Sequence, residues 1–282
     1  MPHDIKSLLT MLNRPDDMAA ILGWASRIAK DFDATADGVF LKYDLAADTS
    51  LFVDGFGFYS TDIAAREIAE ASARAEEVAR EEFDCAAKRG ARSRMGRLQV
   101  ISNALRSELA KLSRQYDLAL THLPEGPTLI AGETVLAELL LQGGVPVFAV
   151  PRSSPNDAPL QTALVAWDGS IEASRAVRAA LTFLKECRAV HVRGFAEKGD
   201  RKADLDGLAR YLRLHGVEPD IAVVDVGDKG AIGKAILDEA ERLAADLIVM
   251  GAFGHSPWRE QLFGGATHDV VRASRKPLIL AH

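Results

Sequence analysis

Short apolar runs alternate with longer amphipathic stretches along the chain. A continuous run such as Leu247-Ile248-Val249-Met250 is typical of a strand buried in a parallel sheet. The stretches between the runs have the apolar spacing of helices that cover such a sheet. The pattern predicts strands at 7–12, 35–41, 97–101, 118–121 and 145–150, and again at 163–167, 189–195, 220–226, 247–250 and 276–281.

The two halves of the chain repeat one order of elements. The expected helices lie at 16–31, 61–89 and 102–116 in the first half, and at 171–185, 202–215 and 231–243 in the second, where a further short helix starts near 266. This alternation predicts an α/β fold with two tandem, open, mainly parallel sheets of five strands, each covered by helices on both faces. A proline-rich polar segment predicts a linker at 153–159 between domains 1–152 and 160–282.

Glycines cluster where one of the predicted buried strands ends. Gly251 and Gly254 follow the run 247–250, and Gly264 and Gly265 precede the short helix that begins near Ala266. Residues without a Cβ let backbone N–H groups approach a ligand, and a helix N-terminus favours an anion. The pattern indicates phosphate binding, although the spacing matches neither a Walker loop nor the dinucleotide fingerprint. A purely structural turn is the alternative.

This strand, loop and helix resemble the ATP-binding signature of the universal stress protein family. The family motif has Gly, two residues, Gly, nine residues, Gly, then Ser or Thr; here Gly251, Gly254 and Gly264 match, and Gly265 replaces the hydroxyl residue. The resemblance spans residues 160–282 and includes Trp167-Asp168-Gly169-Ser170. The first half resembles the family in its order of elements. The family resemblance implies a Rossmann-like fold related to the adenine-nucleotide α-hydrolases.

The resemblance also implies which residues hold ATP, with or without Mg²⁺. Asp168 takes the position that contacts adenine, although it could equally cap the following helix. Phe195 matches the apolar residue beside the base, and Thr267 could supply the hydroxyl that Gly265 lacks. The full expected set is Ala166, Asp168, Phe195, Met250, Gly251, Gly254, Gly264, Gly265, Ala266 and Thr267. His255 and Arg259 could offer charge to a phosphate, but surface solvation is the simpler interpretation.

The first half lacks the residues of this motif. Asn13 stands at the position of Asp168, and the segment after the fourth strand contains Pro124, Glu125 and Pro127. Prolines remove backbone donors that a phosphate would need, and a carboxylate would repel it. We therefore expect this half to bind no ATP and to pair with the second half within the chain. A homodimer is allowed by the sequence and not required.

Composition excludes several classes of protein. A net charge of −6 without a basic patch argues against nucleic acid as a partner. No apolar run reaches the length of a membrane helix. Cys85 and Cys187 form neither a disulfide framework nor a zinc motif, which indicates the reducing cytoplasm.

No catalytic set accompanies the glycine motif, so the sequence predicts a regulatory ATP-binding stress protein, with at most weak, incidental ATP hydrolysis. His122 and His191 have no partner at metal-ligand spacing. One alternative is an interaction or dimerisation module of the same fold without nucleotide, which the replacement at Gly265 favours. Another is a nucleotidyl transferase or ATP pyrophosphatase, which the absence of their phosphate loops disfavours.

Overall fold

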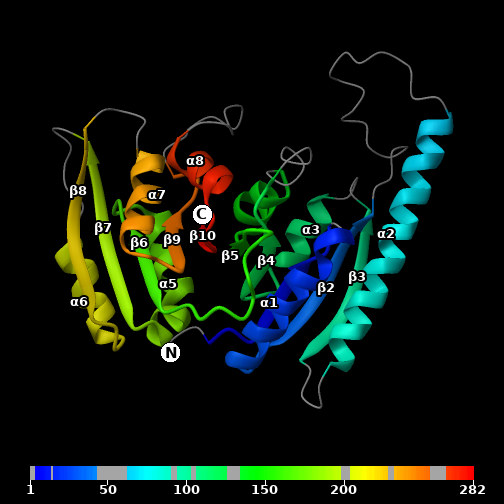
Figure 1. Ribbon diagram of the computed structural model, residues 1–282, viewed down its shortest axis with the longest axis horizontal. Helices are drawn as coiled ribbons and strands as arrows, with labels where there is room; N and C mark the ends of the chain where they lie inside the picture. The colour runs from blue at the N-terminus through cyan, green and yellow to red at the C-terminus, as the bar shows by residue number, and fades with distance from the viewer. Residues whose placement is uncertain are drawn as a thin grey trace.

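The structure is a computed structural model that describes residues 4–13, 15–42, 62–89, 94–102, 106–125, 134–197, 204–227, 232–254 and 265–282. Helices and strands alternate throughout these residues (Figure 1). None of the described helices combines the length and the hydropathy that a membrane-spanning segment requires.

The first half contains five strands and the helices that connect them. Its strands are β1 (Ser7–Met11), β2 (Thr35–Lys42), β3 (Met95–Ser102), β4 (Leu118–His122) and β5 (Val147–Val150). Its helical elements are η1 (Pro15–Asp17), α1 (Met18–Asp31), α2 (Asp62–Lys88), α3 (Arg106–Ser113) and η5 (Glu138–Gly143). The sequence placed each strand within about two residues of its observed bounds. It predicted that α3 continues to 116, whereas the helix ends at Ser113, and residue 102, predicted as the first of this helix, is the last residue of β3.

The second half repeats this series. Its strands are β6 (Thr162–Ala166), β7 (Ala189–Glu197), β8 (Pro219–Gly227), β9 (Leu247–Gly251) and β10 (Leu278–Ala281). Its helices are α5 (Ile171–Glu186), α6 (Leu205–Leu214), α7 (Ile232–Arg242) and α8 (Ala266–Ala273).

The strands of both halves form one ten-stranded sheet in the order β3-β2-β1-β4-β5-β10-β9-β6-β7-β8. All neighbours are parallel except β5 and β10, which pair antiparallel and so join the halves edge to edge. The predicted α/β class with mainly parallel strands is confirmed. The two expected five-stranded sheets are joined into one, because β5 and β10 are edge strands of their own halves and pair with each other.

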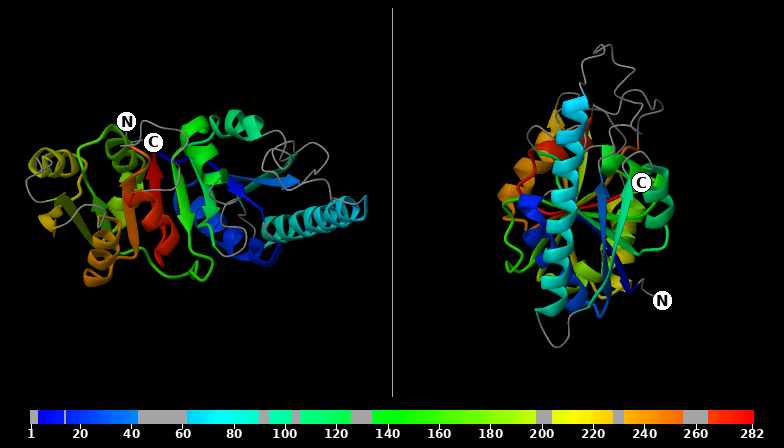
Figure 2. Two further views of the ribbon diagram at one scale, coloured as in Figure 1. Left: turned by 90° about the horizontal axis from the view of Figure 1, so that it is seen from above. Right: turned by 90° about the vertical axis from the view of Figure 1, so that its right-hand side faces the viewer.

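Each face of the sheet carries one layer of helices. Helices α1, α2, α5 and α6 pack on one face and share one apolar core, while α3, η5, α7 and α8 pack on the other. Parallel strands twist relative to one another, and the rotation accumulates over a wide sheet. Seen from above, α6 (yellow) and α2 (cyan) therefore lie on opposite sides at the two ends, although both cover the same face (Figure 2).

An aspartate ties the start of the first strand in each half to the strand beside it. Asp117 Oδ2 accepts hydrogen bonds from the backbone N–H groups of Lys6 and Ser7, both at 2.9 Å. Asp246 Oδ2 accepts from those of Gln161 and Thr162, both at 3.0 Å. Each carboxylate precedes the fourth strand of its half and satisfies backbone donors that the sheet leaves unpaired. The internal repeat therefore extends to individual hydrogen bonds.

Candidate functional site

The candidate site lies at the carboxyl ends of β6, β7 and β9. Strand β6 stands between β9 and β7, so the chain leaves it toward one side of the sheet and later returns on the other. Ligands of open α/β sheets bind at such a reversal of strand order. Helix α5 starts directly after β6, and α8 approaches the same end of the sheet from β9 (Figure 1).

The turn from β6 into α5 is held by side chains that bond to backbone. The Asp168 carboxylate accepts a hydrogen bond from the N–H of Ser170 at 2.9 Å, and Ser170 Oγ accepts from the N–H of Ala173 at 3.0 Å. Ser170 is thus the N-cap of α5, and Gly169 makes the turn with φ of +80°. The sequence left open whether Asp168 caps α5 or contacts adenine; in the structure, Ser170 is the N-cap. The exposed side chain of Asp168 shapes the turn before it.

Gly251 and Gly254 lie against the first turn of α5. A Cβ built on Gly251 would stand 2.6 Å from the backbone nitrogen of Ala173 and 2.9 Å from the Cβ of Glu172. A Cβ on Gly254 would stand 3.0 Å from Glu172 Oε2. Glycine is therefore required at 251 for the approach of helix to strand. This packing role exists whether or not a ligand is bound.

Helix α8 begins at a glycine whose backbone conformation excludes other residues. Gly265 has φ of +99° and ψ of 178°, a combination that is essentially restricted to glycine. Among the described residues, no heavy atom lies within 4 Å of a Cβ built on it, so the described residues leave open space at this point of the helix entrance. A Ser or Thr, the residue of the family signature, would adopt this conformation only under strain.

Thr267 is engaged within the protein. The backbone N–H of Phe253 donates to Thr267 Oγ1 at 3.3 Å, which links the first turn of α8 to the segment that follows β9. The Thr267 hydroxyl accepts this bond, and its role toward a ligand stays a prediction. Gly264, His255 and Arg259 lie outside the described residues.

Apolar residues form the floor of the site. Ala166 and Met250, at the ends of β6 and β9, are 8% and 5% exposed and belong to the core of this face. Four half-buried residues pack on that core at the same end of the sheet: Phe195, Ile232, Phe253 and Ala266. The sequence predicted Phe195 and Ala266 but missed Ile232 and Phe253. Their places after a strand end were the available signal, because parallel strands gather such positions at one edge.

Comparison with known proteins assigns the second half of the chain to a family. Residues 159–282 match the model of the Universal stress protein family. The C-terminal half is a universal stress protein domain. A comparison with curated protein sequences found no significant match.

Solved structures extend the likeness in fold to the first half. A universal stress protein from Archaeoglobus fulgidus DSM 4304 has a TM-score of 0.68 at 20% identity, covering 97% of this chain and 95% of that chain. A protein of unknown function from Pseudomonas aeruginosa PAO1 has a TM-score of 0.57 at 16% identity, with 98% and 92% covered. A universal stress protein solved in complex with cAMP matches 44% of this chain and 99% of its own at 22% identity, with a TM-score of 0.36. At these identities the two full-length matches show a shared fold.

In the first half, side chains occupy the place that corresponds to the glycines of the universal stress protein domain. His122 ends β4 as Gly251 ends β9. Its Nε2–H donates to the backbone carbonyl of Asp17, at 3.3 Å, beside the start of α1. The Asp17 carboxylate in turn pairs with Arg152 Nε at 2.5 Å. Burial lowers the pKa of His122, which therefore stays neutral in the fold.

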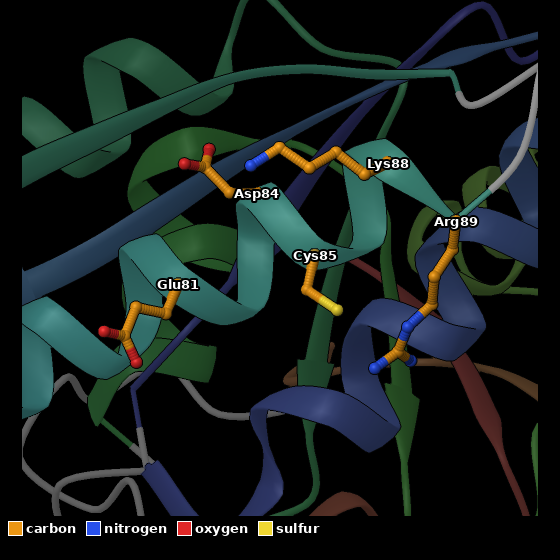
Figure 3. Close-up of a pocket in the computed structure, with 5 residues that line it drawn as sticks. All are labelled: Glu81, Asp84, Cys85, Lys88 and Arg89. Atoms are coloured by element: carbon orange, nitrogen blue, oxygen red, sulfur yellow. The ribbon is translucent and has the colours of Figure 1, made fainter.

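A hollow on the surface of α2 lies outside the universal stress protein domain. It is lined by Glu81, Asp84, Cys85, Lys88 and Arg89, which succeed one another along a single helix (Figure 3). These charges of both signs come from one element, without a strand end or a second helix to converge on a ligand. Among the described residues there is also no group of three or more side chains suited to a metal ion. The edge of β6, β7 and β9 is therefore the candidate site.

Proposed function

We propose that the universal stress protein domain binds an adenine nucleotide, ATP, at the carboxyl ends of β6, β7 and β9. The observation that carries the proposal is the entrance to α8. Gly265 brings the helix N-terminus to an open space with a backbone conformation that only glycine adopts, and such an end supplies N–H donors and partial positive charge. Membership of this domain in the family supports an adenine nucleotide as the ligand, and the geometry of the α8 entrance supports this location.

Two kinds of surface meet at this place, as an adenine nucleotide requires. The half-buried Phe195, Ile232 and Phe253 offer apolar area to a base. The backbone at Gly254 and Gly265 offers donors to phosphates. Asp168 stands beside β6, where its position in the family motif assigns it to adenine. Open space around the Gly265 position is consistent with this fit.

The proposed role is regulatory binding in the stress response and not catalysis. Three polar side chains of the described site are already held by backbone groups: Asp168 by Ser170, Ser170 by Ala173, and Thr267 by Phe253. Each of these three would have to leave its bond before it could act as a nucleophile or general base. A conformational response to a bound nucleotide is the activity that the site supports.

The proposal assigns one nucleotide to each chain. In the first half the His122 ring and the Asp17–Arg152 ion pair occupy the region where the second half has Gly251 and the turn after β6. A nucleotide would have to displace buried, hydrogen-bonded groups there, which costs more free energy than filling an open space.

Gly265→Ala tests the proposal, with Gly216→Ala as its matched control. Both glycines have positive φ, +99° and +82°, and neither has a heavy atom within 4 Å of a built Cβ. Both variants should lose about 1–2 kcal/mol of stability from backbone strain. Gly216 follows α6, at the opposite end of β8 from the site. Only Gly265→Ala should therefore weaken ATP binding. If ATP requires the glycine conformation at this helix entrance, a strain energy of about 1.4 kcal/mol corresponds to about tenfold weaker binding.

The measurements are the nucleotide content of the purified protein and calorimetric titration with ATP, AMP and cyclic AMP. We expect bound nucleotide, a stoichiometry of one, and selective weakening in Gly265→Ala. Absence of binding at millimolar nucleotide would contradict the proposal and favour an interaction module that uses the fold without a ligand.

A further inference from the structure

The side chain of Glu172 runs along the glycine segment of the site. Glu172 is the second residue of α5, and its Cβ would stand 2.9 Å from a Cβ at Gly251. Its Oε2 would stand 3.0 Å from a Cβ at Gly254. The carboxylate therefore lies directly on the backbone that follows β9. No local pattern in the sequence marks this residue, because its place depends on how closely α5 approaches the strand.

This carboxylate has no hydrogen-bond or ion-pair partner among the described residues. The nearest cation on its helix, Arg175, donates from Nη1 to the backbone carbonyl of His282 at 2.7 Å. Glu172 lies in the first turn of α5, where the helix dipole interacts favourably with a negative charge. The Glu172 carboxylate thus stands, without a partner in the described part of the chain, beside the segment to which the proposed function assigns phosphates.

An unpaired carboxylate and a polyphosphate repel each other unless a cation lies between them. Two like charges about 4 Å apart repel substantially even near a protein surface. A divalent cation removes the conflict, because Mg²⁺ is commonly held by one or two carboxylates together with substrate phosphates. A nucleoside monophosphate or a nucleoside brings less negative charge to this place and is repelled less by the carboxylate.

We propose that Glu172 determines the form in which the site accepts its ligand, so that a nucleoside triphosphate binds as the complex with a divalent cation and free triphosphate is rejected. This inference rests on the proposed function and adds to it a residue that discriminates by charge. Glu172 binds the cation, while the apolar floor of the site and Asp168 recognise adenine.

Glu172→Gln tests the inference because it removes the charge and keeps the shape. ATP is titrated into wild type and variant, once in excess EDTA and once in millimolar MgCl₂, with adenosine titrated in parallel. Glu186→Gln, at the far end of the same helix and exposed, is the matched control. Glu172→Asp is the second variant, since it retains the charge. Thermal melting of all four proteins verifies that each is folded.

In wild type, Glu186→Gln and Glu172→Asp, we expect Mg²⁺ to strengthen ATP binding about tenfold or more. In Glu172→Gln we expect ATP to bind in EDTA about tenfold more tightly than to wild type, and Mg²⁺ to change little. Adenosine should bind equally to all four proteins. An unchanged Mg²⁺ dependence in Glu172→Gln would overturn the role of Glu172 and leave the proposed function intact. Absence of any nucleotide binding to wild type would overturn both.

Discussion

At the scale of single residues, the two halves differ at the residue that ends the fourth strand. The same strand end carries Gly251 in the second half and His122 in the first, and the imidazole reaches the carbonyl of Asp17 at 3.3 Å. A glycine admits the first turn of the neighbouring helix or a ligand, whereas a histidine fills the space and bonds to that turn. The residue at this position thus allows a close approach of helix to strand in the second half and makes a side-chain hydrogen bond in the first.

Burial of His122 predicts a pH dependence of stability. Because burial lowers its pKa in the folded state, the unfolded chain binds the proton more readily, and stability falls as the pH drops from about 6.5 through the folded-state pKa. His122→Gln keeps a donor toward Asp17 and does not titrate. The difference in unfolding free energy between pH 7.5 and 5.5, measured with urea, should be smaller in the variant. An equal difference in both proteins would show that other groups dominate this range.

At the scale of elements, a buried ion-pair cluster fixes α7 on the sheet. Arg193 on β7 donates from Nε to Glu239 of α7 at 2.7 Å and from Nη2 to Asp220 of β8 at 2.6 Å. The side chains of Arg193 and Glu239 are 4% and 8% exposed. Hydrogen bonds from Arg242 and Arg193 lower the pKa of Glu239 to about 2 against opposition from burial. The start of α7 carries Ile232 of the site, so this cluster also determines where the floor of the site lies.

A double-mutant cycle tests this cluster. Arg193→Met leaves a buried carboxylate with fewer partners and should cost about 3 kcal/mol, the lower end for a broken buried pair because Arg242 still bonds Glu239. Adding Glu239→Leu removes the stranded charge and should recover most of that loss. Urea unfolding measures the stability of Arg193→Met, of Glu239→Leu and of the double variant. The exposed pair of Arg213 and Glu218 supplies the control, where Arg213→Met should cost less than about 1 kcal/mol. Simple additivity of the two buried substitutions would refute the coupling.

At the scale of the whole molecule, aromatic rings seal the joint between the halves. Phe148 of β5 lies 5.3 Å from Phe183 of α5 and 5.5 Å from Trp24 of α1, centroid to centroid. Phe32 meets Phe183 edge to face at 4.8 Å. The linker packs here too, since Arg27 of α1 donates to the backbone carbonyls of Asn156 and Ala158. The halves thus share one core, and the predicted division into domains 1–152 and 160–282 stays a proposal about sequence and origin.

A shared core predicts that both halves unfold together. Hydrogen exchange followed by mass spectrometry across a urea series reports the halves separately, and wild type should show one common midpoint. Phe183→Ala removes the ring at the centre of the joint and should cost about 3–5 kcal/mol. Phe183→Leu, which keeps apolar volume, should cost less. Separate midpoints for the two halves in wild type would contradict this expectation.

The sequence by itself determined the α/β class, the repeat and nearly all strand positions, and it pointed to the strand end of the candidate site. These features follow from local periodicity and from glycines, which act through neighbouring residues. It also placed Ala166, Phe195, Met250 and Ala266 at one edge, because parallel strands gather their carboxyl ends. Their roles toward a ligand stay predictions.

Only the tertiary structure decided the features that depend on distant segments. The antiparallel pairing of β5 with β10 makes one sheet of two, and no local pattern specifies which edges will meet. The approach of α5 to β9 explains Gly251 and brings Glu172 onto Gly254, and the contact with Phe253 engages the hydroxyl of Thr267. Each is a contact between residues far apart in the chain, so its energy depends on packing that periodicity does not encode.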